Sequence, residues 1–85
     1  MSVGAPGNNP ELWDKLLNFL DERLQLGLLD HLKHTRSYHF EDKILTLQPD
    51  DAQVYDYLSK AAVFQQLLLL AQEATGIEKL KIERP

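Results

Sequence analysis

The sequence predicts a small α+β domain in which helices pack against a short sheet. Three patterns indicate this class. Apolar residues recur at helical spacing over residues 10–24 and 51–74, and they alternate with polar residues over 36–48 and again near the C-terminus. With 85 residues, the chain has room for one domain with one modest core. The expected order is helix, helix, strand, strand, helix, strand.

The first helix is expected over residues 10–24. The preceding Asn9 is a preferred N-cap, Pro10 fits the first helical position, and Glu11 meets the positive end of the helix dipole. Leucines then recur on one side of this helix. The stretch before it, residues 1–9, is rich in Gly, Pro and Asn and is expected to be a flexible tail. Residues 10–85 would form the single domain.

A shorter second helix is expected over residues 26–34, although Gly27 weakens it locally. Strands follow over 36–40 and 44–48. Because only the polar residues 41–43 separate them, these strands should form an antiparallel hairpin.

The second half of the chain begins with a long helical pattern over 51–74, with a break or kink expected near Ser59. Thr75-Gly76 is a typical helix stop, because glycine readily adopts the left-handed conformation that ends many helices. A last strand is predicted over about 78–83, where apolar and charged residues alternate.

Composition narrows the possible functions. A formal net charge of −4 argues against a protein that binds nucleic acid mainly by neutralising phosphates. The absence of cysteine excludes disulfides, cysteine-type zinc sites and thiol nucleophiles. The longest aliphatic run, Leu67 to Leu70, is far shorter than the roughly 20 residues of a membrane span. No signal peptide is recognisable. The cytoplasm is therefore the expected compartment, with no membrane partner.

Motifs for catalysis are missing, so no enzyme, cofactor or metal site is expected. The four glycines are scattered and form no phosphate-binding loop. His31 and His34 are three residues apart, but a metal site would need a further ligand such as His39 or Asp30. We interpret the two histidines as part of a solvated helix end, where they favour the negative end of the dipole.

Acidic residues cluster between positions 41 and 56, which could form a patch that steers a basic partner. Turns and helix caps also favour aspartate, so the cluster has a purely structural alternative. The candidate acidic patch comprises Glu41, Asp42, Asp50, Asp51 and Asp56.

Trp13 is the only tryptophan, in the first turn of the first expected helix. It is either a core residue or an anchor at an interface, where tryptophan is enriched. Its neighbour Leu12 points about 100° away around the helix, so the two cannot share one narrow core stripe.

Together, the Leu12-Trp13 start, the strand containing Leu45 and Leu47, and the Asp56-Tyr57 pair resemble the N-terminal domain of the bacterial replication initiator DnaA. The likeness spans about residues 12–83. Tyr57 stands where that family usually has tryptophan. The positions that fall on the family pattern are Leu12, Trp13, Leu17, Leu20, Leu24, Asp42, Leu45, Leu47, Val54 and Asp56.

Some positions depart from that pattern. Leu29 and Leu32 replace an aromatic pair, Leu28 replaces a partner-facing acidic residue, and Gln53 replaces a phenylalanine implicated in partner binding. A related domain near the C-terminus of the DNA polymerase III tau subunit lacks the aromatic pair and is a rival assignment. Both resemblances imply a KH-like fold of order α-α-β-β-α-β. The Gly-x-x-Gly loop with which KH domains bind RNA is missing here.

The resemblance implies a non-enzymatic protein–protein interaction module of bacterial DNA replication, which recruits helicase or a regulator or associates weakly with itself. The alternatives are a tau-type module that binds the clamp loader or polymerase, and a weak single-stranded nucleic-acid-binding KH-like module. Trp13→Ala is expected to weaken association and leave the fold largely intact. The candidate partner-binding residues are Trp13, Leu16, Leu28, Gln53 and Tyr57.

Overall fold

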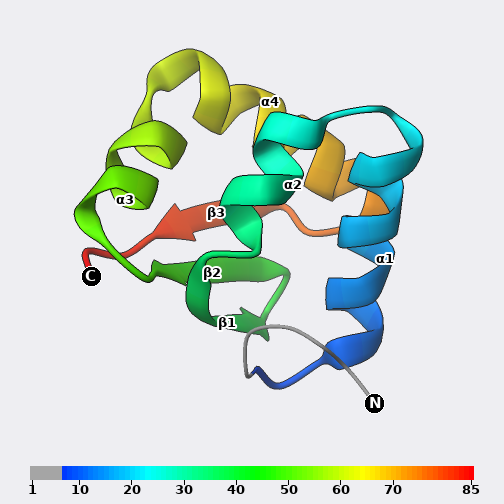
Figure 1. Cartoon of the computed structure of the whole chain (residues 1–85). Helices are drawn as coiled ribbons and strands as arrows, with labels where there is room; N and C mark the ends of the chain where they lie inside the picture. The colour runs from blue at the N-terminus through cyan, green and yellow to red at the C-terminus, as the bar shows by residue number, and fades with distance from the viewer. Residues whose placement is uncertain (1–6) are drawn as a thin grey trace.

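Four helices and three strands follow one another along residues 7–85, which are the residues that the computed structural model describes (Figure 1). The predicted α+β class is confirmed. The elements are α1 (Pro10–Glu22), α2 (Leu26–Leu32), β1 (Thr35–Glu41), β2 (Ile44–Pro49), α3 (Ala52–Ser59), α4 (Ala61–Thr75) and β3 (Lys79–Ile82).

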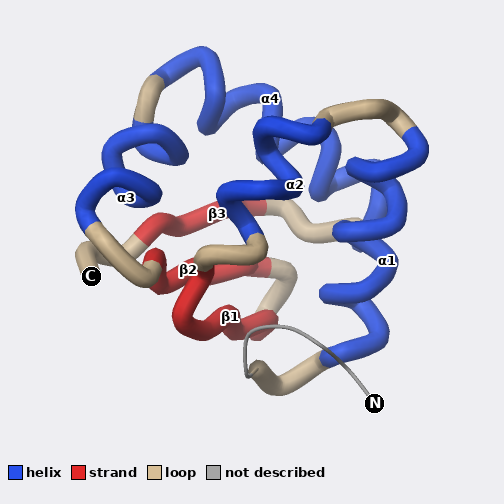
Figure 2. Tube along the Cα trace, in the orientation of Figure 1, coloured by secondary structure: helices blue, strands red, loops and turns tan. Residues whose placement is uncertain are grey.

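The strands form one mixed sheet in the order β1-β2-β3. The predicted hairpin is present, since β1 and β2 pair antiparallel with Glu41 opposite Ile44, and β3 then pairs parallel to β2. Figure 2 shows the three strands side by side, with helices above them. Leu45 and Leu47 of the central strand are buried, whereas the alternate Thr46 is half-buried. One face of the sheet therefore carries the core.

The long helix predicted over 51–74 is two helices, α3 and α4, so the expected order with three helices is corrected to four. The expected break near Ser59 is confirmed at Lys60, whose backbone is extended (φ −63°, ψ 135°). The break has a packing reason: α3 contacts α2, β2 and β3, whereas α4 lies along α1. Because the chain breaks between α3 and α4, each helix can bury its own apolar face.

The residues predicted to start and end helices do so in the structure. Asn9 Oδ1 accepts a hydrogen bond from the backbone N–H of Leu12 at 3.2 Å, and Asp51 Oδ1 accepts one from that of Val54 at 3.0 Å. Gly76 ends α4 in the left-handed conformation, with φ 80°. None of the described helices has the length and apolar character that crossing a membrane would require.

Part of the predicted tail belongs to the folded domain. Gly7 forms a parallel β-bridge with Tyr38, and a Cβ at Gly7 would collide with the Tyr38 ring. The Asn8 amide accepts from the Phe40 N–H at 2.8 Å and donates to the Phe40 carbonyl at 2.6 Å. Residues 7–9 therefore lie along the outer edge of β1 and belong with the folded domain, which corrects the expectation that they are part of a flexible tail. Residues 1–6 of the predicted tail lie outside the described residues.

Candidate partner-binding surface

Three of the five candidate partner-binding residues lie in the core. Trp13 is 1% exposed, and Leu16 and Leu28 are also buried. The Trp13 ring stacks on Tyr38, with centroids 4.3 Å apart and planes 4° from parallel. Their assignment to an exposed surface is therefore wrong for the folded chain, because their side chains are already part of the hydrophobic core.

The other two candidates share one face of α3. Gln53 is exposed and Tyr57 is half-buried. They are four residues apart, so they are neighbours on the helix surface, and Asp56 lies exposed beside Tyr57. The Asp51 cap fixes the start of this helix and thereby the direction in which Gln53 and Tyr57 project.

A histidine on α2 completes this region. The His31 ring stacks on Tyr57, with centroids 3.7 Å apart and planes 11° from parallel. Its Nδ1 donates to the Gly27 carbonyl at 2.7 Å, which fixes the ring orientation and its tautomer. A Cβ at Gly27 would lie 3.2 Å from the Tyr57 hydroxyl, so the tip of the tyrosine side chain closely approaches α2 at this glycine.

We call Gly27, His31, Gln53, Asp56 and Tyr57 the α2–α3 surface. Sequence reasoning placed His31 on a solvated helix end and missed its contact with Tyr57. The helical pattern could not reveal that contact, because it depends on how α2 and α3 cross. Gly27, one turn before His31, lies beside the Tyr57 hydroxyl, but a single glycine does not reveal such a contact in the sequence.

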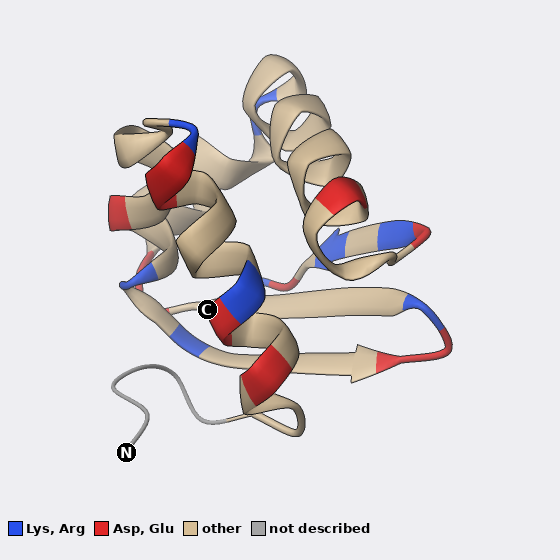
Figure 3. Cartoon of the chain, turned by 90° about the vertical axis from the view of Figure 1, so that its right-hand side faces the viewer, with Lys and Arg blue, Asp and Glu red and all other residues tan. Residues whose placement is uncertain are grey.

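The predicted acidic patch is split between the two ends of β2. Glu41 and Asp42 lie at the hairpin turn, while Asp50 and Asp51 immediately precede α3 and Asp56 lies within it. Six residues of extended strand separate the groups by roughly 20 Å. Figure 3 shows the acidic hairpin turn at one tip of the sheet. The five residues therefore cannot act as one patch.

Several of these carboxylates have local structural partners. Asp51 caps α3, Glu41 Oε1 lies 3.0 Å from His39 Nε2, and Asp50 Oδ1 lies 3.9 Å from Arg36 Nε. Exposed pairs of this kind contribute little to stability. Asp56 adds a negative charge directly to the α2–α3 surface.

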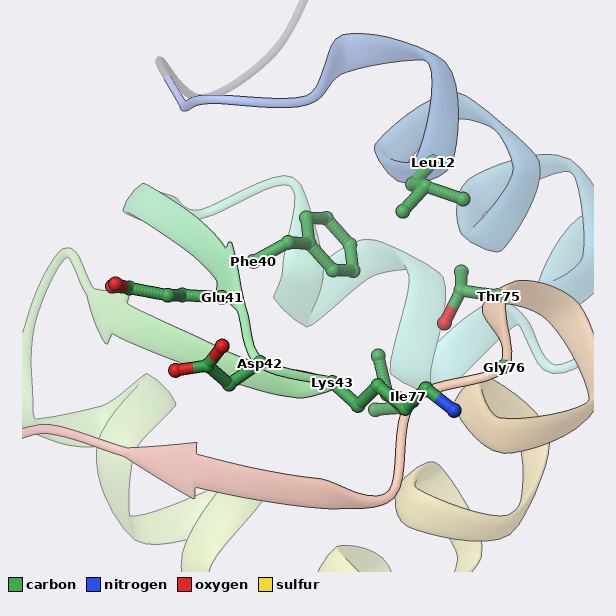
Figure 4. A pocket seen from close by; sticks show the side chains of 8 residues that line it. All are labelled: Leu12, Phe40, Glu41, Asp42, Lys43, Thr75, Gly76 and Ile77. Carbon is green, nitrogen blue, oxygen red and sulfur yellow. The ribbon is translucent and has the colours of Figure 1, made fainter.

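The chain also has a shallow apolar hollow of about 250 Å³ between the start of α1, the hairpin turn and the end of α4. Figure 4 shows Leu12, Phe40 and Ile77 around it, while the carboxylates of Glu41 and Asp42 point away. The Thr75 hydroxyl donates to the Ala71 carbonyl at 2.7 Å. With no polar groups converging on it, the hollow offers little to orient a small ligand.

The three histidines do not form a metal centre. His31 stacks on Tyr57, and His39 pairs with Glu41 on β1. Within residues 7–85, no three His, Asp or Glu side chains gather in a way that could hold a metal ion.

Comparisons with protein-family models, with curated proteins and with solved structures each found no match for this chain. The resemblance to the initiator's N-terminal domain therefore stays a prediction. Function is inferred from that resemblance and the α2–α3 surface together.

Proposed function

We propose that this chain is a non-enzymatic protein–protein interaction module of bacterial DNA replication, with a KH-like fold, that binds a protein partner through its α2–α3 surface. The observation that carries the proposal is the half-buried His31–Tyr57 stack beside the exposed Gln53. Half-buried tyrosines supply large contact area with few rotatable bonds, and tyrosine is enriched among residues that dominate binding energy.

The resemblance implies a partner-binding position on the same helix, although this chain departs from the family pattern there. Gln53 occupies the position of a partner-binding phenylalanine, and Tyr57 occupies that of a tryptophan. Leu28, the third position that the resemblance indicated, is buried and is not part of this proposal.

The charge of the surface indicates the chemistry of the partner. Asp30 on α2 and Asp56 on α3 are both exposed, and Asp50 lies just before α3. A partner with basic side chains around an apolar or aromatic centre would complement this arrangement. Within the proposed setting, we expect a subunit of the replicative helicase or a regulator of initiation.

The test is a titration of the chain with purified bacterial replicative helicase by isothermal calorimetry. Tyr57→Leu keeps apolar contact with α2 but removes the ring, and Gln53→Ala removes an exposed contact at little cost to the helix. Each variant is expected to bind about tenfold more weakly, which corresponds to about 1.4 kcal/mol. Lys81→Gln on β3 is the matched control and should bind like the unchanged chain.

Circular dichroism must show that the variants remain folded. Equal affinity of Tyr57→Leu, Gln53→Ala and Lys81→Gln would overturn the α2–α3 surface as the binding site. Binding to the replicative polymerase but not to helicase would favour the tau-type alternative. Binding to a labelled single-stranded oligonucleotide at about 0.15 M salt, without a protein partner, would favour the nucleic-acid alternative.

A further inference from the structure

The outer side of β3 is an open edge of the sheet. The strand order β1-β2-β3 leaves two edges, and residues 7–9 lie along the one that β1 forms. Among residues 7–85, no strand pairs with the outer side of β3, which Figure 2 shows as the last of the three strands. An open edge presents unpaired backbone N–H and C=O groups to which another extended chain can bind.

The hydrogen bonds between β3 and β2 determine which backbone groups point outward. The N–H groups of Lys79 and Glu83 donate to carbonyls of the β2 side, at 3.2 and 2.8 Å. Because backbone groups alternate in direction along a strand, the N–H and C=O groups of Leu80 and Ile82 point away from β2. No described residue outside the sheet forms a hydrogen bond with them. The open edge therefore offers two donors and two acceptors.

The side chains of β3 determine what an added strand must carry. Lys81 lies on the face of the sheet away from the core, where it lines a polar hollow with Thr46, its partner in the β2–β3 register. Lys79 lies two residues earlier, hence on the same face, and both lysines are exposed. Leu80 is buried in the core and Ile82 is half-buried. An added strand would thus place alternate side chains beside lysines and the others beside apolar residues.

The charges of this edge favour an acidic partner segment. Figure 3 shows two basic bands along β3. Lysines protect many edge strands, because an incoming strand must bring its own side chains next to them. Carboxylates at the matching positions would instead form favourable cross-strand pairs. The acidic residues at the two ends of β3 have basic neighbours of their own, since Glu78 lies 3.9 Å from Lys43 and Glu83 precedes Arg84.

A second copy of the chain fits this edge poorly. In a symmetric antiparallel pair of β3 strands centred on Leu80 or on Lys81, a lysine of one copy would lie opposite a lysine of the other. Like charges directly opposite each other destabilise a strand pair. The occupant is therefore expected to be a segment of a different protein.

We propose that the open edge of β3 binds an extended segment of another protein by antiparallel strand addition, and that this segment alternates apolar and acidic residues. Its two apolar residues pair with Ile82 and Leu80 and exchange backbone hydrogen bonds with them. Its two acidic residues lie opposite Lys81 and Lys79. The edge shares no residue with the α2–α3 surface, and the inference does not rest on the proposed function.

The test is an NMR titration of the chain with the blocked peptide Ser-Val-Glu-Val-Glu-Ser, followed through the backbone amide signals. The signals of Leu80 and Ile82 should shift most, with a dissociation constant on the order of 10⁻⁴ M. The matched peptide Ser-Val-Lys-Val-Lys-Ser should bind at least about fivefold more weakly. Since the chain carries a net charge of −4, non-specific attraction would favour the basic peptide, so a preference for the acidic one reports on the edge itself.

Charge reversal tests the role of the lysines. The double variant Lys79→Glu with Lys81→Glu should reverse the preference and bind the basic peptide more tightly than the acidic one. The matched control is Lys15→Glu with Lys60→Glu, which changes the net charge equally at exposed positions outside β3 and should keep the preference. Circular dichroism must show that both variants are folded.

Methylation of single peptide amides tests the backbone pairing without changing the chain. An N-methyl group on either valine removes a hydrogen bond to β3 and should weaken binding at least about tenfold. An N-methyl group on either glutamate, whose N–H points away from β3, should have a much smaller effect.

No shift of the Leu80 and Ile82 signals at about 1 mM acidic peptide would overturn the proposal and leave the lysines as protection of the edge. Equal effects of methylation at valine and glutamate would also overturn it. Failure of this proposal and failure of helicase binding are distinguishable. Lys81→Gln should weaken peptide binding and leave helicase binding unchanged, whereas Tyr57→Leu should do the reverse.

Discussion

Trp13 and Tyr38 form the aromatic centre of the core, with Gly7 against the other face of the tyrosine. Truncation of a buried tryptophan to alanine typically costs about 3–5 kcal/mol. An 85-residue domain has a total stability of roughly 4–13 kcal/mol. We therefore expect Trp13→Ala to lower the urea midpoint sharply or to unfold the chain, contrary to the expectation from sequence.

Circular dichroism is the measurement for this prediction, because the variant loses the only tryptophan and with it the usual fluorescence signal. Trp13→Phe is the control. It keeps an aromatic ring against Tyr38 and should lose clearly less stability. A native-like urea midpoint for Trp13→Ala would contradict the burial of this side chain.

Tyr38 is expected to make the free energy of unfolding depend on pH in the alkaline range. Burial raises the pKa of its hydroxyl above the ordinary 10.0, Asp14 adds to the rise, and a hydrogen bond with the Asn9 backbone opposes it. The unfolded chain therefore loses this proton first, so the free energy of unfolding should fall as the pH rises through about 10. Urea midpoints from pH 8 to 11 measure the decline, and Tyr38→Phe should make it shallower. An identical decline in both proteins would exclude Tyr38 as its source.

At the scale of the elements, the β1–β2 turn holds two non-glycine residues in the left-handed conformation, Asp42 (φ 52°) and Lys43 (φ 61°). Both positive φ values are required by the type I′ turn that joins a two-residue hairpin. Lys43→Gly is expected to stabilise the domain by about 0.5–1 kcal/mol, the strain relief exceeding the added freedom of the unfolded chain. The backbone bonds from the Lys43 carbonyl to β3 are retained.

The control for this prediction is Lys43→Ala, which also removes the exposed ammonium near Glu78 but keeps a Cβ at the strained position. Urea unfolding should show a gain for glycine and none for alanine. Equal changes in both variants would assign the effect to the lost charge.

At the scale of the whole molecule, the net charge of −4 opposes association of two copies. With the centres about 25 Å apart, as the extents of 27 × 24 × 23 Å suggest, the repulsion is about 3 kcal/mol in water without salt. Salt screens this repulsion to about 0.8 kcal/mol at 0.02 M and to less than about 0.1 kcal/mol at 0.2 M. Association of two copies through apolar surface should therefore strengthen roughly three- to fourfold over this range, measured by sedimentation equilibrium. Association that weakens with salt would instead be held by charge pairs.

Local signals in the sequence predicted the elements well, because each acts within a few residues. Asn9, Asp51 and Gly76 mark helix ends through hydrogen bonds or backbone conformation in their own turn. The short polar turn predicted the hairpin in the same way. The break near Ser59 was also predicted, whereas its consequence, two helices with different packing partners, depends on contacts far along the chain.

The sequence by itself determined the α+β class, the places where most elements begin and end, and the charge and lack of cysteine that limit the chemistry. Only the tertiary structure decided which apolar residues reach the surface. Helical periodicity does not distinguish whether Trp13, Leu28 and Leu24 are buried or exposed. It reports spacing along a helix and not what packs against the helix. Burial of Trp13 depends on Tyr38, 25 positions away, and exposure of Leu24 depends on how the chain leaves α1.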